Sequence, residues 1–392
     1  MEIVMRKKVA VLLPWLKMGG TNKIALNFMR ELTQYCDVTL ILSQNTGELV
    51  PELSPEIHLM VDKMKEFKEI FIDDIKQVNI VNIFRDVLYY AKIRLGKDSI
   101  DNYRYIVDRN SSISDLEFDC AISYHGQSPE RLLNLLYRVH SKKKIAWIHG
   151  EIDFSDDKCK RLKKYYQKLD QIFFISELTK SSFKRIMDVD NFKSTIYYNP
   201  NNKEDILKKS ELTCDVNFSQ DYINLLTVGR ISPEKGQDMI PAITKKLLDK
   251  GYLVRWYVIG DGDMRNSLEN IVKKYDVEES VILLGTKTNP YNYMKLCDIY
   301  IQPSYTEGYS ATICEAGILG KPVICTINCG IRERIDPGKD ALFVDASVDS
   351  LTEAIESLIV NEDKRNDLAH NISKIDFEGR QEISKFLNFI NN

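Results

Sequence analysis

Short, continuous apolar runs alternate with longer stretches of helical periodicity along the whole chain. In the first half, the runs predict strands at 8–14, 37–43, 119–124, 144–149 and 171–176. The runs are apolar throughout, which is typical of strands buried on both faces of a parallel sheet. Helical patterns fill the gaps, as in residues 22–32 after the first strand. Residues 61–110 depart from this rhythm, because they form a long, charged, amphipathic stretch that predicts inserted helices.

The second half repeats the alternation. Its apolar runs predict strands at 222–228, 253–259, 280–284, 298–304, 322–326 and 341–345. Between them lie helical patterns such as 238–251, where Gly251 is a typical C-terminal stop.

Strand–helix alternation at this spacing predicts an α/β protein with two doubly wound domains. We place the first domain at residues 1–200, the second at 201–375, and a closing helix that returns to the first domain at 376–392. The polar stretch 197–219, with its Asn-Pro turn signals, is interpreted as the linker.

Composition agrees with a soluble globular protein of this size. The 392 residues are 44% hydrophobic and 28% charged, and the net charge of −3 gives no indication of nucleic-acid binding. Residues 1–200 carry 31 Lys and Arg against 27 Asp and Glu, whereas residues 201–392 carry 23 against 30. This asymmetry weakly favours an anionic partner for the first half. No apolar run approaches the roughly 18–20 residues of a membrane span.

Cysteine usage points to a reducing compartment. Eight cysteines are scattered along the chain without C-x-x-C spacing, and no signal peptide precedes the first predicted strand. We therefore expect reduced thiols in a cytoplasmic protein. The closest pair, Cys325 and Cys329, lacks the two further ligands that a zinc site requires, so no metal site is predicted.

Glycines and charged residues follow several predicted strands, at the edge where open parallel sheets bind their ligands. Gly19 and Gly20 open the helix after the first strand, and His149 follows the strand at 144–149. Adjacent glycines at a helix N-terminus admit a phosphate to free backbone N–H groups. A plain tight turn and a structural histidine are the ordinary alternatives.

Two further junctions lie in the second half. Arg230 and Lys235 follow the strand at 222–228, in the sequence GRISPEKG, and Glu307 follows the strand at 298–304. An arginine fork and a lysine point charge in one Pro-containing turn suit a diphosphate. Solvated surface charges are the ordinary alternative.

Competing phosphate and metal motifs are incomplete. VGRISPEKGQ lacks the Gly-Lys-Ser/Thr ending of a P-loop, and IGDGDMR has Arg265 where a dinucleotide fingerprint has its third glycine. Asp261 and Asp263 do not continue into a calcium loop, because residue 272 is valine.

Together these junctions resemble the retaining glycosyltransferases of family 4. The similarity covers most of the chain and is most specific over residues 223–322, where LLTVGRISPEKGQD, WYVIGDGDMRNSLE, VILLGT and CDIYIQPSYTEGYSATICEAGILGKPVI follow the family's order and spacing. MGGTNKIAL is similar to the family's N-terminal glycine loop. The resemblance implies the GT-B fold, in which two Rossmann-like domains face each other across a cleft.

The resemblance also implies the role of each site residue. Glu315 would hold the ribose hydroxyls of a nucleotide sugar, and Glu307 would face the donor sugar. His149 would hydrogen-bond that sugar, and Arg230 with Lys235 would offset the charge on the leaving diphosphate. The remaining donor-binding residues, which would present backbone N–H groups or allow close approach to the phosphates, are Gly19, Gly20, Gly308, Tyr309 and Ser310.

The implied enzyme is a retaining hexosyl- or N-acetylhexosaminyltransferase that needs no metal or other cofactor. Its donor would be a nucleoside-diphosphate sugar, with uridine as the default base, and its acceptor a glycan or lipid-linked glycan of bacterial surface polysaccharide synthesis. A nucleotide-sugar epimerase of the same fold and a non-catalytic scaffold are the alternatives. Slow donor hydrolysis, donor interconversion and absence of donor binding would distinguish the three.

A basic cluster in the first half suggests a partner as well. At helical spacing some of these residues share one face with Tyr165 and Leu169, which predicts a peripheral contact with anionic lipid at the inner face of the cell membrane. A solvated basic helix is the alternative. The cluster comprises Lys142, Lys143, Lys144, Lys158, Lys160, Arg161, Lys163, Lys164 and Lys168.

Overall fold

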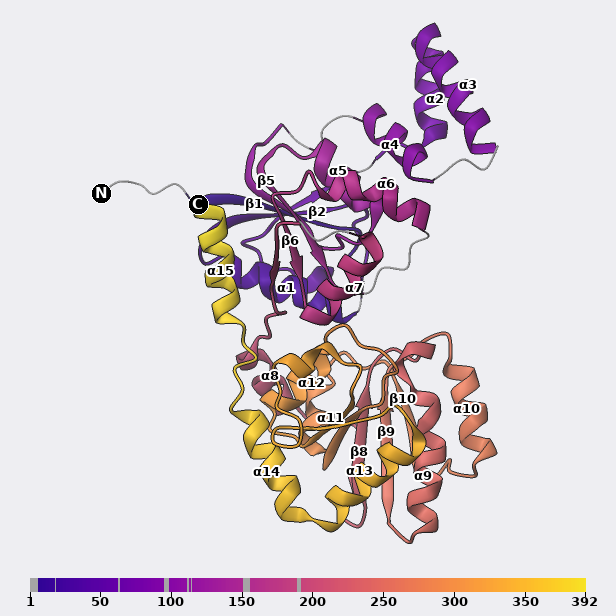
Figure 1. Ribbon diagram of the computed structural model, residues 1–392, viewed down its shortest axis with the longest axis vertical. Coiled ribbons are helices and arrows are strands. Elements are labelled where there is room, and N and C mark those ends of the chain that lie inside the picture. Colours follow the sequence, from indigo (N-terminus) through magenta and orange to yellow (C-terminus); the bar gives the residue numbers. More distant parts are fainter. Residues whose placement is uncertain are drawn as a thin grey trace, which may run out of the picture. The chain divides into compact units, whose positions relative to one another are not determined.

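The computed structural model describes residues 6–17, 19–62, 64–94, 99–110, 113, 115–150, 156–188 and 192–392. The chain divides into two compact units, the first formed by residues 1–199 with 380–392 and the second by residues 200–379 (Figure 1). The predicted boundary after residue 200 lies one residue from this division. The last helix, α15 (Arg380–Asn391), is part of the first unit.

The first unit is built on a seven-stranded sheet in the order β3-β2-β1-β4-β5-β6-β7, in which every neighbouring pair is parallel. The direction of this order reverses between β1 and β4, as in a doubly wound fold. The strands are β1 (Lys7–Leu13), β2 (Cys36–Leu42), β3 (His58–Val61), β4 (Phe118–Ser123), β5 (Ser141–Ile148), β6 (Gln171–Phe174) and β7 (Ser194–Ile196).

Helices pack on this sheet because they bury apolar faces against it. Phe28 of α1 contacts Trp147 of β5 edge to face at 5.1 Å, and it contacts Phe386 of α15 at 5.5 Å. All three side chains are fully buried, so α15 is fixed to the first unit by its core. The helices are α1 (Gly20–Leu32), α2 (Phe67–Lys76), α3 (Ile80–Arg94), α4 (Ser99–Arg109), α5 (Pro129–Arg138), α6 (Asp156–Tyr166), α7 (Glu177–Met187) and α15.

The five strands predicted in this half are confirmed to within a few residues, whereas β3 and β7 were not predicted. Both are edge strands of only four and three residues, and their side chains are exposed or half-buried. β7 (STI) has no apolar run, and β3 (HLMV) has only three consecutive apolar residues after a histidine, which is too short a run to predict a buried strand. The stretch 61–110 contains the helices α2, α3 and α4, and Figure 1 shows α2 and α3 standing out from the rest of the unit.

The second unit is built on a six-stranded parallel sheet in the order β10-β9-β8-β11-β12-β13. The order reverses between β8 and β11, so this domain is doubly wound as well, and all six predicted strands are confirmed. They are β8 (Ile223–Val228), β9 (Val254–Ile259), β10 (Val281–Gly285), β11 (Ile299–Gln302), β12 (Val323–Thr326) and β13 (Leu342–Val344).

The helices of the second unit cover both faces of its sheet. Gly251, with φ of +88°, ends α9 as predicted. The linker interpretation of 197–219 is wrong in part, because Asn202 accepts the backbone N–H of Asp205 and so caps a helix there. The helices are α8 (Lys203–Ser210), α9 (Ile240–Asp249), α10 (Arg265–Lys274), α11 (Tyr291–Leu296), α12 (Ala311–Ile318), α13 (Val348–Val360) and α14 (Glu362–Ser373).

Candidate functional site

Two loops meet where the strand order of the second sheet reverses. The first, residues 229–236, leaves the carboxyl end of β8, and the second, residues 303–310, leaves the neighbouring β11. Tyr305 joins them by donating its backbone N–H to the carbonyl of Glu234 at 2.9 Å. Ligands of doubly wound sheets bind at such a reversal, so we take this end of the sheet as the candidate site.

Glycine allows the backbones around this site to approach closely. Gly236 has φ of +68°, and a Cβ atom there would lie 2.2 Å from the carbonyl oxygen of Pro303. Gly260, which follows β9, has φ of +145°, and its Cβ would lie 1.9 Å from the carbonyl oxygen of Gly229. Neither space admits a side chain, so both glycines are required by the crossing of the loops.

Lys235 and Glu307 form an ion pair across the two loops. The Lys235 Nζ lies 2.6 Å from Glu307 Oε2, and the side chains are only 19% and 13% exposed. The backbone of Glu307 is held on both sides, because its N–H donates to Asn328 at 3.0 Å and its carbonyl accepts from Gly330 at 2.9 Å. The carboxylate is therefore fixed beside the lysine at the end of β11.

Arg230 is more exposed. Its Nη2 lies 3.2 Å from Glu234 Oε1, and its side chain is 72% exposed. Burial opposes the ionisation of Glu234, but the hydrogen bond from Ser232 and the nearby cations hold the pKa of that carboxyl below its ordinary value. Gln237 fixes the loop by donating to the Arg230 carbonyl at 2.9 Å. Both predicted cations thus lie in one loop, each beside a carboxylate, and Glu234 is a partner that the sequence did not suggest.

Helix α12 supplies the next group of predicted residues. Ser310 is its N-cap, and the backbone N–H groups of the first helical turn have no intrahelical acceptor. Glu315 is half-buried inside this helix, and Tyr291 donates its hydroxyl to Glu315 Oε1 at 3.2 Å. Tyr309 is buried with its hydroxyl accepting from Arg334 at 3.0 Å, so its side chain anchors the loop 303–310.

Two buried polar residues at the end of β11 were not predicted. Gln302 and Ser304 are 2% and 0% exposed, and Gln302 donates to Ser304 at 2.9 Å. Thr312 of α12 donates to Gln302 at 3.1 Å, and Ser304 donates to Glu307 at 3.4 Å. This chain of hydrogen bonds links β11, α12 and the ion pair. A polar pair at the end of a buried strand was the sequence signal that could have identified it.

Gly19, Gly20 and His149 belong to the first unit. A Cβ atom at either glycine would meet no atom within 4 Å, so packing does not require glycine there and the space can admit a ligand. His149 stacks on Tyr124 with ring centroids 4.4 Å apart. Burial, reinforced by His125, lowers the pKa of His149 well below its ordinary value, so the ring is neutral. Within the described residues neither of its buried nitrogens has a hydrogen-bond partner, which leaves hydrogen-bonding capacity for a ligand.

The predicted basic cluster is largely engaged within its own unit. Lys142 pairs with Asp119 at 3.0 Å, and Lys143, Lys144 and Lys163 donate to backbone carbonyls. Lys168 donates to the Tyr137 hydroxyl. The expected neighbours Tyr165 and Leu169 are 5% and 8% exposed, since they pack into the core of the unit. The apolar part of the predicted lipid-facing surface is therefore not on the surface.

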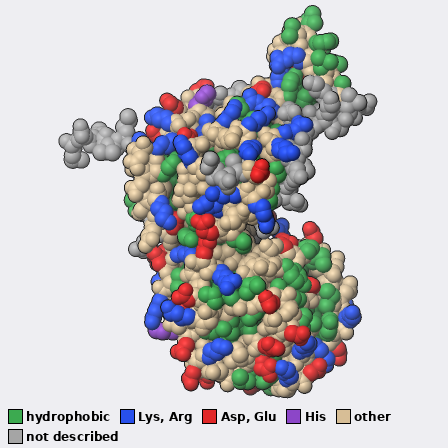
Figure 2. All heavy atoms as spheres, viewed as in Figure 1, with side chains coloured by type: hydrophobic (Ala, Val, Ile, Leu, Met, Phe, Trp, Pro, Cys, Tyr) green, Lys and Arg blue, Asp and Glu red, His purple; other side chains and the backbone are tan. Residues whose placement is uncertain are grey.

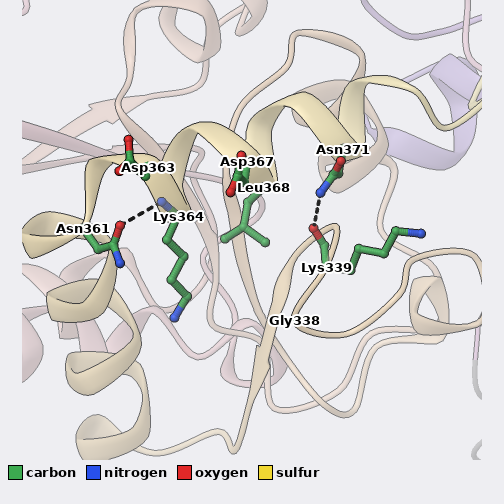
Figure 3. Close-up of a pocket in the computed structure, with 8 residues that line it drawn as sticks. All are labelled: Gly338, Lys339, Asn361, Asp363, Lys364, Asp367, Leu368 and Asn371. Atoms are coloured by element: carbon green, nitrogen blue, oxygen red, sulfur yellow. Dashed lines mark hydrogen bonds between the residues drawn. The ribbon is translucent and has the colours of Figure 1, made fainter.

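A cavity of about 410 Å³ lies elsewhere on the second unit, between α14 and the turn at 338–339 (Figure 3). It contains none of the predicted site residues. Asn371 closes one side by donating to the Lys339 carbonyl at 3.0 Å, and the charged residues of the lining include Asp363, Lys364 and Asp367. These charges have mixed sign and do not converge on one point in Figure 3, so we assign no ligand to it.

Comparison with protein families gives one match, which lies in the second unit. Residues 209–375, a little under half of the chain, are similar to the family described as "Glycosyl transferases group 1". The matched residues contain both loops of the candidate site and α12.

Curated relatives are similar over part of their length. The chain is 24% identical to an uncharacterized glycosyltransferase of Methanocaldococcus jannaschii, over 57% of this chain and 60% of that protein. It is 29% identical to Protein CapJ of Staphylococcus aureus, over 45% and 48%. It is 26% identical to N-acetylgalactosamine-N,N'-diacetylbacillosaminyl-diphospho-undecaprenol 4-alpha-N-acetylgalactosaminyltransferase of Campylobacter jejuni, over 51% and 53%. The matches thus span about half of each of these relatives.

Solved structures share the fold over nearly the whole chain. HepE of Anabaena, crystallised with UDP and glucose, has a TM-score of 0.71 at 14% identity, over 98% of this chain and 100% of that one. WaaG, a glycosyltransferase involved in lipopolysaccharide biosynthesis, has a TM-score of 0.62 at 14% identity, over 98% and 100%. Together with the two doubly wound sheets, these similarities show that the chain has the GT-B fold.

Proposed function

We propose that this protein is a retaining glycosyltransferase that moves a hexose or N-acetylhexosamine from a nucleoside-diphosphate sugar, with uridine as the base, to a glycan or lipid-linked glycan. The observation that carries the proposal is the ion pair of Lys235 and Glu307, which places a cation and a fixed carboxylate at the strand reversal of a domain similar to the glycosyltransferases of group 1. HepE, which shares the fold, was crystallised with UDP and glucose, and this supports the choice of donor.

The diphosphate would be bound by charges that are already gathered in the loop 229–236. Arg230 and Lys235 lie beside Glu234 and Glu307, and a diphosphate offers these cations a partner of higher charge. The open end of α12 adds backbone N–H groups and the positive end of the helix dipole. These groups also stabilise the leaving nucleoside diphosphate as the glycosidic bond breaks.

The ribose would be held by Glu315. Each carboxylate oxygen accepts more than one hydrogen bond, so the contact with Tyr291 leaves acceptor capacity for a diol. Tyr291 also fixes the position of the carboxylate, which reduces the ordering cost of binding. Glu307, held by its own backbone contacts, would then face the sugar rather than the nucleotide.

Transfer would proceed on one face of the sugar. The bond between the anomeric carbon and the diphosphate oxygen breaks, and a bond forms between that carbon and the acceptor hydroxyl oxygen. The hydroxyl proton passes to an oxygen of the leaving diphosphate, so no protein base is required. His149 would hydrogen-bond the donor sugar, and Gly19 with Gly20 would admit the phosphates. No metal or other cofactor enters this scheme.

The acceptor is proposed from the names of two relatives. The Campylobacter jejuni relative is named for a diphospho-undecaprenol substrate, and another relative, of Staphylococcus aureus, is named for capsular polysaccharide biosynthesis. We therefore place this enzyme in the cytoplasm, at the inner face of the membrane, in surface polysaccharide synthesis. Contact of the basic cluster with anionic lipid is part of this proposal, and the exposed Lys160 and Lys164 are the members best placed for it.

A thermal-shift screen with a panel of nucleotide sugars tests the proposal. One donor at 100 times its dissociation constant should add roughly 2.7 kcal/mol to the stability of the second unit. Arg230→Ala should reduce the shift without changing the melting temperature of the free protein, because the Arg230 side chain is exposed. The absence of any shift across the panel would refute the donor site.

A further inference from the structure

The helical insertion places a large apolar surface in solvent. We call α2, the turn at 77–79 and α3 the helical hairpin. Nine of its large apolar side chains are between 39% and 73% exposed. Figure 2 shows hydrophobic side chains on the visible face of this part of the molecule, at the top of the view. Monomeric proteins rarely expose contiguous apolar patches of this kind without a binding role. The nine residues are Ile72, Ile75, Val78, Ile80, Val81, Phe84, Val87, Leu88 and Tyr90.

The inside of the hairpin combines apolar and acidic side chains. Ile70 and Tyr89 are buried there, and the Tyr89 ring stacks on Tyr105 of α4 with centroids 4.3 Å apart. Asp74 and Asp86 are 5% and 0% exposed. Asp74 pairs with Arg109 of α4, and Asp86 accepts the hydroxyl of Tyr105, also from α4. Burial raises the pKa of Asp86 above its ordinary value. A surface helix rarely buries acids and normally keeps its apolar stripe covered, so two buried acids together with an exposed apolar stripe are unusual for helices that face water.

The exposed apolar side chains surround the distal end of the helical hairpin. On α3 they recur at 80, 84, 87 and 88, which is one continuous helical stripe. Val78 extends the surface over the turn, where its φ of +55° is unusual for a β-branched residue. Ile72 and Ile75 continue it onto α2. Because this apolar surface includes both helices and the tip, it would be covered more completely if the tip were immersed in lipid than if one side contacted a flat protein surface.

The charges near this surface favour an anionic partner. Lys68, Lys76 and Arg85 are exposed on the helical hairpin. Of the hairpin's acids, Asp73 pairs with Lys65 at 2.8 Å, and Asp74 and Asp86 point inward to α4. Glu69 is exposed at the start of α2, away from the tip, where it accepts the backbone N–H of Glu66. Positive charge beside an apolar surface suits anionic lipid headgroups above acyl chains.

The backbone N–H groups at the tip are hydrogen-bonded within the hairpin and do not need water as a partner. The N–H groups of residues 77, 78, 79 and 80 donate to the carbonyls of Asp73, Ile75, Asp74 and Val78. Because an unsatisfied backbone group is costly in lipid, such internal pairing is what insertion of a turn requires. Among the described residues, no helix has the length and apolar character needed to cross a membrane.

We propose that the helical hairpin is a membrane anchor whose tip enters one leaflet of an anionic bilayer. From Ile80 to Leu88 the helix rises about 12 Å, which is within the roughly 15 Å of one leaflet's hydrocarbon. The anchor uses apolar burial, so it differs from contact through the basic cluster, which would use charge alone. It does not depend on the proposed catalytic activity, although it would bring the protein to a lipid-linked acceptor.

Vesicle flotation of the full chain tests the anchor. Wild type should float with vesicles of phosphatidylcholine and phosphatidylglycerol, and most of the binding should persist in high salt. Val81→Glu with Phe84→Glu should lower the partition coefficient at least about tenfold, since burial of one such side chain alone is worth about that factor. The matched control is Leu253→Glu with Val360→Glu, whose side chains are 59% and 66% exposed in the second unit. This control should float like wild type.

A second readout covers the case in which the glutamate variant fails to fold. Phe84→Trp should shift its emission to the blue when these vesicles are added, whereas Leu253→Trp should not. Failure of wild type to float, or equal losses in both double variants, would overturn the anchor. So would a lipid-free dimer by light scattering that the Val81 and Phe84 changes convert to a monomer, because the surface would then join two copies of the chain. Unchanged donor hydrolysis in the Val81→Glu and Phe84→Glu variant would separate this result from the catalytic proposal.

Discussion

Replacing Lys235 by methionine probes the centre of the candidate site. The change keeps the length of the side chain but removes its charge from a position 2.6 Å from Glu307. Since the two side chains are only 19% and 13% exposed, the glutamate would be left as an uncompensated and largely buried charge.

The size of the effect follows from this burial. Breaking a buried ion pair by removing one partner costs about 3–5 kcal/mol, whereas removing both charges together is often close to neutral. We therefore expect Lys235→Met to lower the free energy of unfolding of the second unit by about 3 kcal/mol. Lys235→Met combined with Glu307→Gln should recover most of that loss. Both variants should lose donor turnover.

Urea unfolding measures this directly. Trp256 is fully buried in the second unit, so its fluorescence, with the other two tryptophans replaced by phenylalanine, reports on that unit. The matched control is Lys245→Met, because Lys245 pairs with Asp249 at the same 2.6 Å but both side chains are about half exposed. It should leave the unfolding curve unchanged. Equal effects of the two methionine variants, or no recovery in the double variant, would refute the reasoning.

Four further outcomes are expected. Arg230→Ala should reduce kcat/KM more than tenfold, a loss above roughly 1.4 kcal/mol, while leaving unfolding unchanged; a smaller loss would remove Arg230 from the diphosphate site. Calorimetry with UDP should show weaker binding for Glu315→Gln and unweakened binding for Glu307→Gln, and equal losses would contradict the division between ribose and sugar. Activity should survive excess EDTA, and a fall to background would reveal a metal. Burial lowers the pKa of His125 to about 4 and that of His149 below its ordinary value, so protons bind preferentially to the unfolded chain. The free energy of unfolding should therefore keep its full value above pH 6.5 and decrease as the pH falls toward 4. The decrease should be smaller in His125→Gln.

The fold could be predicted because strands buried on both faces of a parallel sheet have continuous apolar runs in the sequence. Eleven apolar runs correspond to eleven of the thirteen strands in the described residues, including the short edge strand β13, whereas β3 and β7 contain at most three consecutive apolar residues. The helix α8 was missed because its sequence is polar and follows Asn-Pro turn signals. Local pattern therefore located the strands but could not distinguish a polar surface helix from a linker.

Of the candidate site, the sequence predicted only which residues follow the ends of the strands. The sequence placed Arg230 and Lys235 after one strand and Glu307 after another, and the structure brings both loops to one end of the sheet. It could not reveal that Lys235 has a carboxylate partner, since the contact between Lys235 and Glu307 joins residues far apart in sequence. Tertiary packing also explains why the prediction for the basic cluster was wrong in part. Its expected surface neighbours Tyr165 and Leu169 pack into the core.

Time-resolved proton NMR of donor turnover tests the central claim most directly. With the donor selected by thermal shift and with water or a simple glycoside as acceptor, we expect release of the nucleoside diphosphate together with a first-formed product that keeps the anomeric configuration of the donor. Lys235→Met should abolish this turnover. An inverted first product, interconversion of one nucleotide sugar into another, or an unchanged donor after prolonged incubation would each contradict a retaining transferase.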